Sequence, residues 1–172
     1  MKLGAIVAIG ISLSSASAFA APGDYLKFLQ SLEGDWQGQG EARDYTNGQT
    51  TSFDFSMSMY REGNTNTWLA QTSESTQSGQ GNRDGITFQL AAQILEIDHD
   101  SITGGFSSVT DSTDHSIDYD VSETQGMDFI DHYYHWETSA NGLSGSVRIE
   151  DNGMPIYEES FSASKSQRSV RH

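Results

Sequence analysis

Apolar and polar side chains alternate along several separate stretches of this chain, and this alternation is the strongest constraint on its fold. It is clearest at residues 53–59 and recurs at 115–121 and 143–150. Neighbouring side chains of a β-strand point to opposite faces, so the apolar residues Phe53 and Phe55 would share one face. The alternation therefore predicts half-buried strands with one apolar face and one solvent face.

Asn-Gly pairs separate these stretches, at Asn47-Gly48, Asn141-Gly142 and Asn152-Gly153. Both residue types tolerate a positive φ, and the pair is a strong signal for the tight turn of a β-hairpin. Successive strands joined by hairpins form an antiparallel meander, which loses its exposed edges by closing into a barrel. We therefore predict an all-β fold, a closed antiparallel up-and-down β-barrel of about 8–10 strands. The predicted strands cover residues 36–44, 51–61, 65–77, 86–97, 102–110, 115–121, 127–138, 143–150 and 155–163.

One short helix precedes the predicted strands. Its apolar residues fall at the offsets of a single helix face, at Tyr25, Phe28, Leu29 and Leu32. Asp24 is placed to cap the start of this helix and Gly34 to end it. The sequence therefore predicts a helix over residues 24–32 that buries one face.

The N-terminal segment has the pattern of an export signal. Lys2 gives it a positive start, residues 3–13 are apolar, and Ala18-Phe19-Ala20 forms an A-x-A cleavage site. The apolar run is too short to span a bilayer, so a membrane anchor is the disfavoured alternative. We expect a soluble bacterial protein that is periplasmic or secreted. Its predicted parts are a cleaved signal peptide at 1–20, one barrel domain at 21–164 and a flexible tail at 165–172.

Charge and cysteine content exclude several classes of function. The chain has 24 acidic and 9 basic residues, a formal net charge of −15 at pH 7. Such a charge argues against binding to nucleic acid or to an anionic membrane surface, because both would repel it. The absence of cysteine excludes disulfides, thiolate metal ligands and cysteine nucleophiles. We expect no nucleic-acid partner and no membrane insertion, whereas the acidic surface could meet a basic protein partner.

A motif directly after the predicted helix carries a family resemblance. The segment Gly34–Glu41 contains a G-x-W-x-G-x-G pattern centred on Trp36. It resembles the first strand of the lipocalin-like (calycin) superfamily and is most similar to small bacterial and nitrobindin-like members. The resemblance implies that Gly34 and Trp36 close one end of the barrel, with Arg148 from a late strand over the indole ring. The glycines permit the strong coiling of a barrel strand.

Heme needs a separate test, because the nitrobindin-like barrels that this chain resembles bind it through a histidine on a late strand. The predicted last strand has no histidine between Pro155 and Ser162. We therefore predict no cofactor and rank heme below an organic ligand. We expect no metal site either, because the acidic stretches around His99 and His115 lack the spacing of an EF-hand loop.

The densest group of chemically active side chains lies on the predicted strand 127–138. It supplies five candidate ligand-binding residues: Asp131, His132, Tyr134, His135 and Trp136. His132 and His135 point to opposite faces and cannot both ligate one metal, whereas Asp131 and His135 could share a site. Neither face is cleanly apolar, which predicts a polar patch inside a cavity or at its mouth. The alternative is an ordinary aromatic strand with surface histidines.

Met57 and Trp68 are further candidates to line a pocket. Methionine adapts to irregular apolar ligands, and a tryptophan ring offers a large apolar surface with one donor. Both residue types also serve as core filler, and the core is the favoured alternative for both positions. These two residues complete the set of candidate ligand-binding positions.

Three functions fit these observations. The first is an exported lipocalin-like barrel that binds a small, partly apolar organic ligand, because such barrels enclose room for about one small molecule. The second is a calycin-fold enzyme, an isomerase, lyase or hydrolase, using His132 or Asp131 with His135 as acid–base groups. The third is an acidic periplasmic interaction protein. The catalytic residues stay unknown, and the sequence favours the binding protein.

Export gives a direct test of the N-terminal interpretation. If the A-x-A site is cleaved, the exported protein starts at Ala21. The intact mass of protein recovered from the periplasm or the medium would then match residues 21–172. Exported protein that retains residues 1–20 would contradict the prediction.

Overall fold

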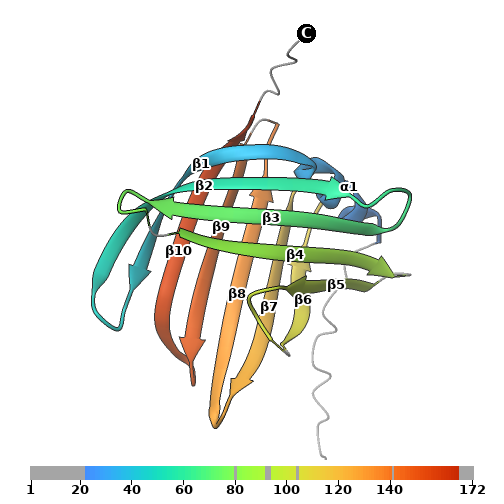
Figure 1. The fold of residues 1–172 in the computed structure, drawn as a ribbon. Coiled ribbons are helices and arrows are strands. Elements are labelled where there is room, and N and C mark those ends of the chain that lie inside the picture. The colour runs from blue at the N-terminus through green and yellow to red at the C-terminus, as the bar shows by residue number, and fades with distance from the viewer. Residues whose placement is uncertain (1–21, 80, 92–93, 104, 141, 167–172) are drawn as a thin grey trace, which may run out of the picture.

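The structure, a computed structural model, is an antiparallel β-barrel with one helix (Figure 1). It describes residues 22–166 apart from residues 80, 92–93, 104 and 141. The predicted signal peptide and most of the predicted tail lie outside the described residues, as does the side chain of Asp24. The elements are α1 (Pro22–Leu32), β1 (Gly34–Asp44), β2 (Gln49–Arg61), β3 (Thr67–Thr76), β4 (Gly81–Ala91), β5 (Ile94–His99), β6 (Phe106–Ser112), β7 (Ser116–Gln125), β8 (Asp128–Thr138), β9 (Gly142–Asp151) and β10 (Met154–Lys165).

The strands form one sheet that curls until its two edges approach each other. Their order is β5-β4-β3-β2-β1-β10-β9-β8-β7-β6, and each neighbouring pair is antiparallel. At the edges, the backbone N–H of Ile97 on β5 donates to the Oγ atom of Ser107 on β6 at 3.2 Å. The predicted fold class is therefore confirmed: an all-β, up-and-down and nearly closed barrel with one short helix.

Two predicted strands have different boundaries in the structure. The predicted strand 86–97 is two strands, β4 and β5, because the chain reverses after Ala91 without a glycine, proline or asparagine to signal the turn. The predicted strand 102–110 starts only at Phe106. Ile102 belongs to the preceding turn, where its N–H donates to the carbonyl of His99 at 3.1 Å.

Helix α1 covers one end of the barrel, beside the ends of β1 and β2 in Figure 1. Its four apolar residues are all at most 6% exposed, and they join the core at Tyr25, Phe28, Leu29 and Leu32. The indole Nε1 of Trp36 donates to the carbonyl of Leu32 at 2.8 Å, which ties the helix to β1. No helix in the described part of the chain combines the length and apolar character needed to cross a membrane.

The glycines of β1 lie on the same inward face as Trp36. A Cβ atom on Gly38 would collide with the backbone of β10 at Ser162, and one on Gly40 would collide with the ring of Phe53. There is therefore no room for larger side chains at Gly38 and Gly40, and aromatic rings from β2 and β10 occupy the space beside these glycines. One such pair is Phe55 with Phe161, whose stacked rings are 4.0 Å apart.

The cation that lies against Trp36 is Lys165, whose Nζ is 5.0 Å from the centre of the ring. The predicted contact with Arg148 is not formed. Val147 and Ile149 take the inward positions of β9, so Arg148 points outward, where it pairs with Glu150 and Glu158. The last strand therefore supplies the cation because β10 is the hydrogen-bonded neighbour of β1.

Trp36 is 2% exposed and joins the helix to the barrel, so its removal should be costly. We expect Trp36→Ala to lower the free energy of unfolding by about 3–5 kcal/mol, measured by urea denaturation. Gln37→Ala is the control, because its side chain lies on the outer face of the same strand, and it should change stability by about 0.5 kcal/mol or less. A loss below about 1 kcal/mol for Trp36→Ala would show that the indole does not hold this end closed.

Candidate functional site

The barrel contains an interior cavity of about 500 Å³ on the side away from α1. Inward side chains from strands on all sides of the barrel form its wall. Its apolar part comes from Phe55, Ile86, Trp136, Val147 and Phe161. The volume falls within the range of small-molecule sites, and the mixture of apolar surface with a few polar groups is typical of them.

Strand β8 contributes three of the predicted site residues to this cavity. His132, Tyr134 and Trp136 all line it, so the even-numbered face of β8 is the inward face. Trp136 is 3% exposed, and its Nε1–H has no hydrogen-bond acceptor among the described residues. A buried donor without an acceptor is costly and uncommon, which makes this position notable beside a cavity.

The two other predicted residues of β8 point outward and do not share a site. The carboxylate of Asp131 accepts a hydrogen bond from Ser122 at 2.6 Å. The Nδ1 atom of His135 instead lies 2.8 Å from Asp118. Each side chain therefore has its own partner on β7, and the predicted acid–base pair of Asp131 with His135 is not assembled.

The remaining predicted positions, Met57 and Trp68, belong to the core and do not border the interior cavity. Met57 is 2% exposed and Trp68 is fully buried. The indole Nε1 of Trp68 donates to Glu33 at 2.8 Å, and Arg61 lies 5.1 Å from the centre of the ring. Trp68 therefore packs at the end of the barrel that α1 covers.

A buried polar chain supports one wall of the cavity. His99 on β5 is 3% exposed. Its Nδ1 atom lies 2.6 Å from Asp84, and its Nε2 atom lies 3.0 Å from the hydroxyl of Tyr119. Tyr134 stacks on Tyr119 with ring centres 4.7 Å apart, and its ring is equally close to that of His99. This chain fixes the position of the Tyr134 ring, which faces the cavity.

Within the Asp84–His99–Tyr119 group, the neighbouring residues keep Asp84 ionised. Burial alone would raise the pKa of Asp84, but the hydrogen bond and charge of His99 and the backbone N–H of Ser101 lower it below its ordinary value. Burial raises the pKa of Tyr119 well above its ordinary value, and burial together with the charge of Asp84 raises that of Tyr134. Both tyrosines are therefore neutral hydrogen-bonding groups at physiological pH.

Two carboxyl groups, Glu74 from β3 and Glu159 from β10, meet at the wall of the cavity and share a hydrogen bond. The hydroxyl of Tyr157 donates to Glu159 at 2.7 Å. Burial, followed by the charge and hydrogen bond of Glu159 and the charge of Asp84, raises the pKa of Glu74 to about 8. Burial also raises the pKa of Glu159, against the hydrogen bonds from Tyr157 and Glu74 that lower it. The pair therefore holds one proton near neutral pH.

The acid pair and the Asp84–His99–Tyr119 hydrogen-bonded group do not follow from the sequence patterns described above. A usable signal was present in the alternation of β5, where Leu95, Ile97 and His99 share the inward face. His99 was interpreted as part of an acidic turn, which hid this pattern. Glu74 and Glu159 had no such signal. An inward strand face is recognised by its apolar residues, so a carboxylate at an inward position is assigned to the outer face instead.

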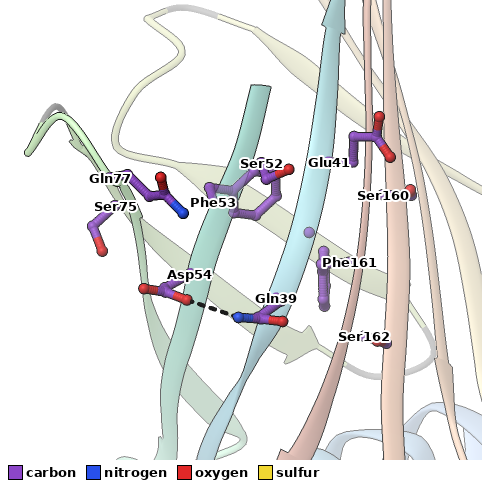
Figure 2. Close-up of a pocket in the computed structure, with 11 residues that line it drawn as sticks. Gln39, Glu41, Ser52, Phe53, Asp54, Ser75, Gln77, Ser160, Phe161 and Ser162 are labelled. Carbon is purple, nitrogen blue, oxygen red and sulfur yellow. Dashed lines mark hydrogen bonds between the residues drawn. The ribbon is translucent and has the colours of Figure 1, made fainter. Parts of the chain in front are cut away.

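A second hollow lies on the outer surface over β1, β2 and β10, and Figure 2 shows its side chains. Polar groups such as Glu41 and Ser160 surround it, and Gln39 donates to Asp54 across it at 3.3 Å. These side chains are exposed and already well solvated. We favour the interior cavity as the candidate site because more of its lining is apolar, whereas the outer hollow has only Phe53 and Phe161 as large apolar lining residues.

The described residues assemble neither a metal cluster nor the late-strand histidine through which nitrobindin-like barrels bind heme. No group of three or more histidine, aspartate or glutamate side chains in the described ranges is placed to hold a metal ion. Strand β10 lines the cavity with Tyr157, Glu159 and Phe161, so the last strand offers no histidine ligand there. Both ring nitrogens of His99 already have partners. The residues present therefore do not fit a heme held from the last strand.

Comparison with known proteins places the fold. No protein-family model and no curated protein matches the sequence. Several solved structures are similar to the barrel. The crystal structure of Rv2717c from M. tuberculosis is 12% identical, with a TM-score of 0.56 over 83% of this chain and 97% of that chain. The S-type phycobiliprotein lyase CPES from Guillardia theta is 8% identical, with a TM-score of 0.57 over 84% of this chain and 93% of that one.

A third similar structure is a protein of unknown function from the DUF3598 family of Nostoc punctiforme PCC 73102. It is 13% identical, with a TM-score of 0.55 over 80% of this chain and 49% of that chain. Identities this low establish a shared fold and nothing finer. Together with the nearly closed antiparallel barrel, these likenesses show a lipocalin-like fold. The nitrobindin-like resemblance and the role of the G-x-W-x-G-x-G motif stay predictions.

The raised pKa of Glu74 gives a test of the acid pair. An unfolded glutamate ionises near 4.5, whereas Glu74 in the folded protein ionises near 8. Between these pH values Glu74 is protonated in the folded state and ionised in the unfolded chain. The free energy of unfolding of the wild type therefore falls as pH rises through this range. We expect Glu74→Gln to become increasingly stabilising, relative to the wild type, from about pH 5 to about pH 8.

Urea denaturation at several pH values measures this difference. Glu41→Gln is the matched control, because Glu41 is exposed on the outer face of β1. Its stability relative to the wild type should stay nearly constant across the same range. Parallel stability curves for Glu74→Gln and the wild type would contradict the shared-proton interpretation.

Proposed function

We propose that this protein binds a small, partly apolar organic molecule in the interior cavity of its barrel. The observation that carries the proposal is the cavity itself, about 500 Å³ with aromatic and polar groups on one continuous wall. Burial of an apolar ligand surface there supplies most of the affinity, and a few fixed polar groups orient the ligand. The lipocalin-like fold is consistent with this use.

Three features of the cavity support a binding role. The ring of Tyr134 is held by stacking on Tyr119 and against His99, so it presents a fixed apolar face. Trp136 adds a second aromatic wall with a donor that lacks an acceptor. His132 offers a polar edge, with its Nε2 atom 3.3 Å from Glu123. Groups that are already fixed lose little conformational entropy when a ligand binds.

A calycin-fold enzyme is the second candidate. One structural neighbour is named a phycobiliprotein lyase, so a barrel of this fold can serve as an enzyme. In this chain, His132 is the predicted acid–base residue that lines the cavity. Substitution of His132 would then abolish turnover and leave binding of a neutral ligand intact.

We also retain two proposals from the sequence. The first is export to the periplasm or the medium, which rests on the N-terminal signal pattern. The second is a protein partner with a basic surface, which rests on the net charge of −15. Association through such a surface would weaken strongly with added salt, whereas binding in the interior cavity would not.

Tryptophan fluorescence tests the binding proposal. All three tryptophans belong to the core cluster, but Trp136 alone among them lines the cavity. We expect the neutral apolar probe N-phenylnaphthylamine to bind with one-to-one stoichiometry, to quench tryptophan emission and to gain emission itself. Trp136→Phe should remove most of the tryptophan response, because energy transfer and contact quenching weaken when the ring beside the probe is lost.

Trp68→Phe is the matched control, since it makes the same substitution away from the cavity and should retain the response. Circular dichroism confirms that each variant is folded. Equal responses in the two variants would place the probe elsewhere on the protein. No response to the probe or to host extract would favour the acidic interaction protein instead.

A further inference from the structure

The wall of the interior cavity has a pronounced charge asymmetry. Four carboxyl side chains line it, and none of the described lining residues is lysine or arginine. The four are Glu74, Asp84, Glu123 and Glu159. Basic side chains lie elsewhere: Arg148 is on the outer face, and Lys165 lies against Trp36. The potential inside the barrel is therefore negative, and low-polarity walls strengthen such a potential.

Among the described residues, two of the four acids contact a histidine and two contact no basic side chain. Asp84 contacts His99, and Glu123 contacts His132. Within the described part of the chain, Glu74 and Glu159 interact with each other and with Tyr157, and no lysine, arginine or histidine forms an ion pair with either. Glu159 is 8% exposed, so this carboxyl group is held in a buried site without a cation. Buried acids of this kind are rare unless they are paired.

A second and independent feature of the same cavity is its aromatic wall. Phe55, Tyr134, Trp136, Tyr157 and Phe161 all border it. Aromatic faces attract cations through the ring quadrupole, and cages of such rings bind organic ammonium groups in many proteins. The side chain of Trp136, with its unpartnered Nε1–H, belongs to this wall. Aromatic faces beside two carboxyl groups that form no ion pair among the described residues offer both parts of an ammonium site.

We propose that the ligand of the cavity is a cationic organic amine, whose apolar part packs on the aromatic wall and whose ammonium group lies between Glu74 and Glu159. This inference rests on the proposed function and names the chemical class of its ligand. An ammonium group gives both carboxyl groups a charge-assisted partner in a buried site. An anionic ligand would be repelled by the same groups and would also lose its hydration.

The carboxyl groups of Glu74 and Glu159 share a proton when no ligand is bound, and the ammonium group would replace this proton. Binding of the amine should release this proton below about pH 8, so its affinity should rise as pH increases from about 6 to about 8. A neutral ligand should show no such rise. The other titratable groups that face the cavity are Asp84, His99, Glu123, His132, Tyr134 and Tyr157.

Three naphthalene probes that differ only in the charge of their polar group distinguish the effect of ligand charge on affinity from the effect of apolar contact. Naphthylethylamine is cationic, naphthylethanol is neutral and naphthylacetate is anionic at neutral pH. Isothermal titration calorimetry in about 0.15 M salt screens the outer charges of the protein, because the Debye length is then about 8 Å. We expect the amine to bind about tenfold more tightly than the alcohol, and the acetate to bind most weakly.

Variants locate the preference within the cavity. The double variant Glu74→Gln with Glu159→Gln should bind the amine and the alcohol equally, and it should lose the rise in amine affinity with pH. Glu41→Gln is the control, because it removes an acid from the outer face and should keep the full preference. Circular dichroism shows whether each variant is folded; if the double variant does not fold, the wild-type probe series decides alone.

The outcomes distinguish the inference from the proposed function. If the alcohol binds as tightly as the amine, or the acetate more tightly, the cavity binds neutral or anionic ligands and the inference is wrong, while the binding function stands. A preference for the amine that survives in the double variant also overturns the inference. If neither these probes nor N-phenylnaphthylamine binds, the proposed function itself fails.

Discussion

The contact between helix α1 and the inward face of the barrel determines where a cavity exists in this molecule. The apolar face of α1 packs over one end, and the hydrogen bond from Trp36 to Leu32 fixes the helix to the first strand. This end is filled by large rings such as Trp68 and Phe88, both fully buried. Because one end is sealed and packed, the interior volume that remains lies at the other end, where four carboxyl side chains line it.

The two ends of the barrel therefore have different energetic roles. The packed end buries apolar area and supplies stability. The hollow end holds acids and aromatic rings that do not fill its volume, and the buried carboxyl of Glu159 is an element that a purely structural barrel would not need. Proteins commonly carry such locally unfavourable groups where they bind ligands, and the rest of the fold offsets the cost.

How much could be predicted from the sequence depends on the strand. In β2, the inward residues from Phe53 to Met59 are all apolar, so alternation identified both the strand and its buried face. In β8, polar residues occupy both faces, so the sequence could indicate β8 as a candidate strand but could not say whether His132 or His135 points inward. The inward position of Glu159 was missed because alternation treats a charged residue as outward. The contact of Lys165 with Trp36 depends on the pairing of the first and last strands, which no local pattern encodes.

The two edge strands of the sheet, β5 and β6, leave the described part of the barrel without a continuous ring of backbone hydrogen bonds. Nine strand pairings join ten strands, and in the described residues no backbone ladder joins β5 to β6. The bond from Ile97 to Ser107 links this seam through a side chain. Hydrogen-bonded ladders resist stretching, whereas a seam of side-chain contacts widens without breaking any ladder. The barrel can therefore widen along the line between β5 and β6 without loss of a backbone ladder, which would let the proposed binding cavity adjust to ligands of different width while the other eight strands keep their register.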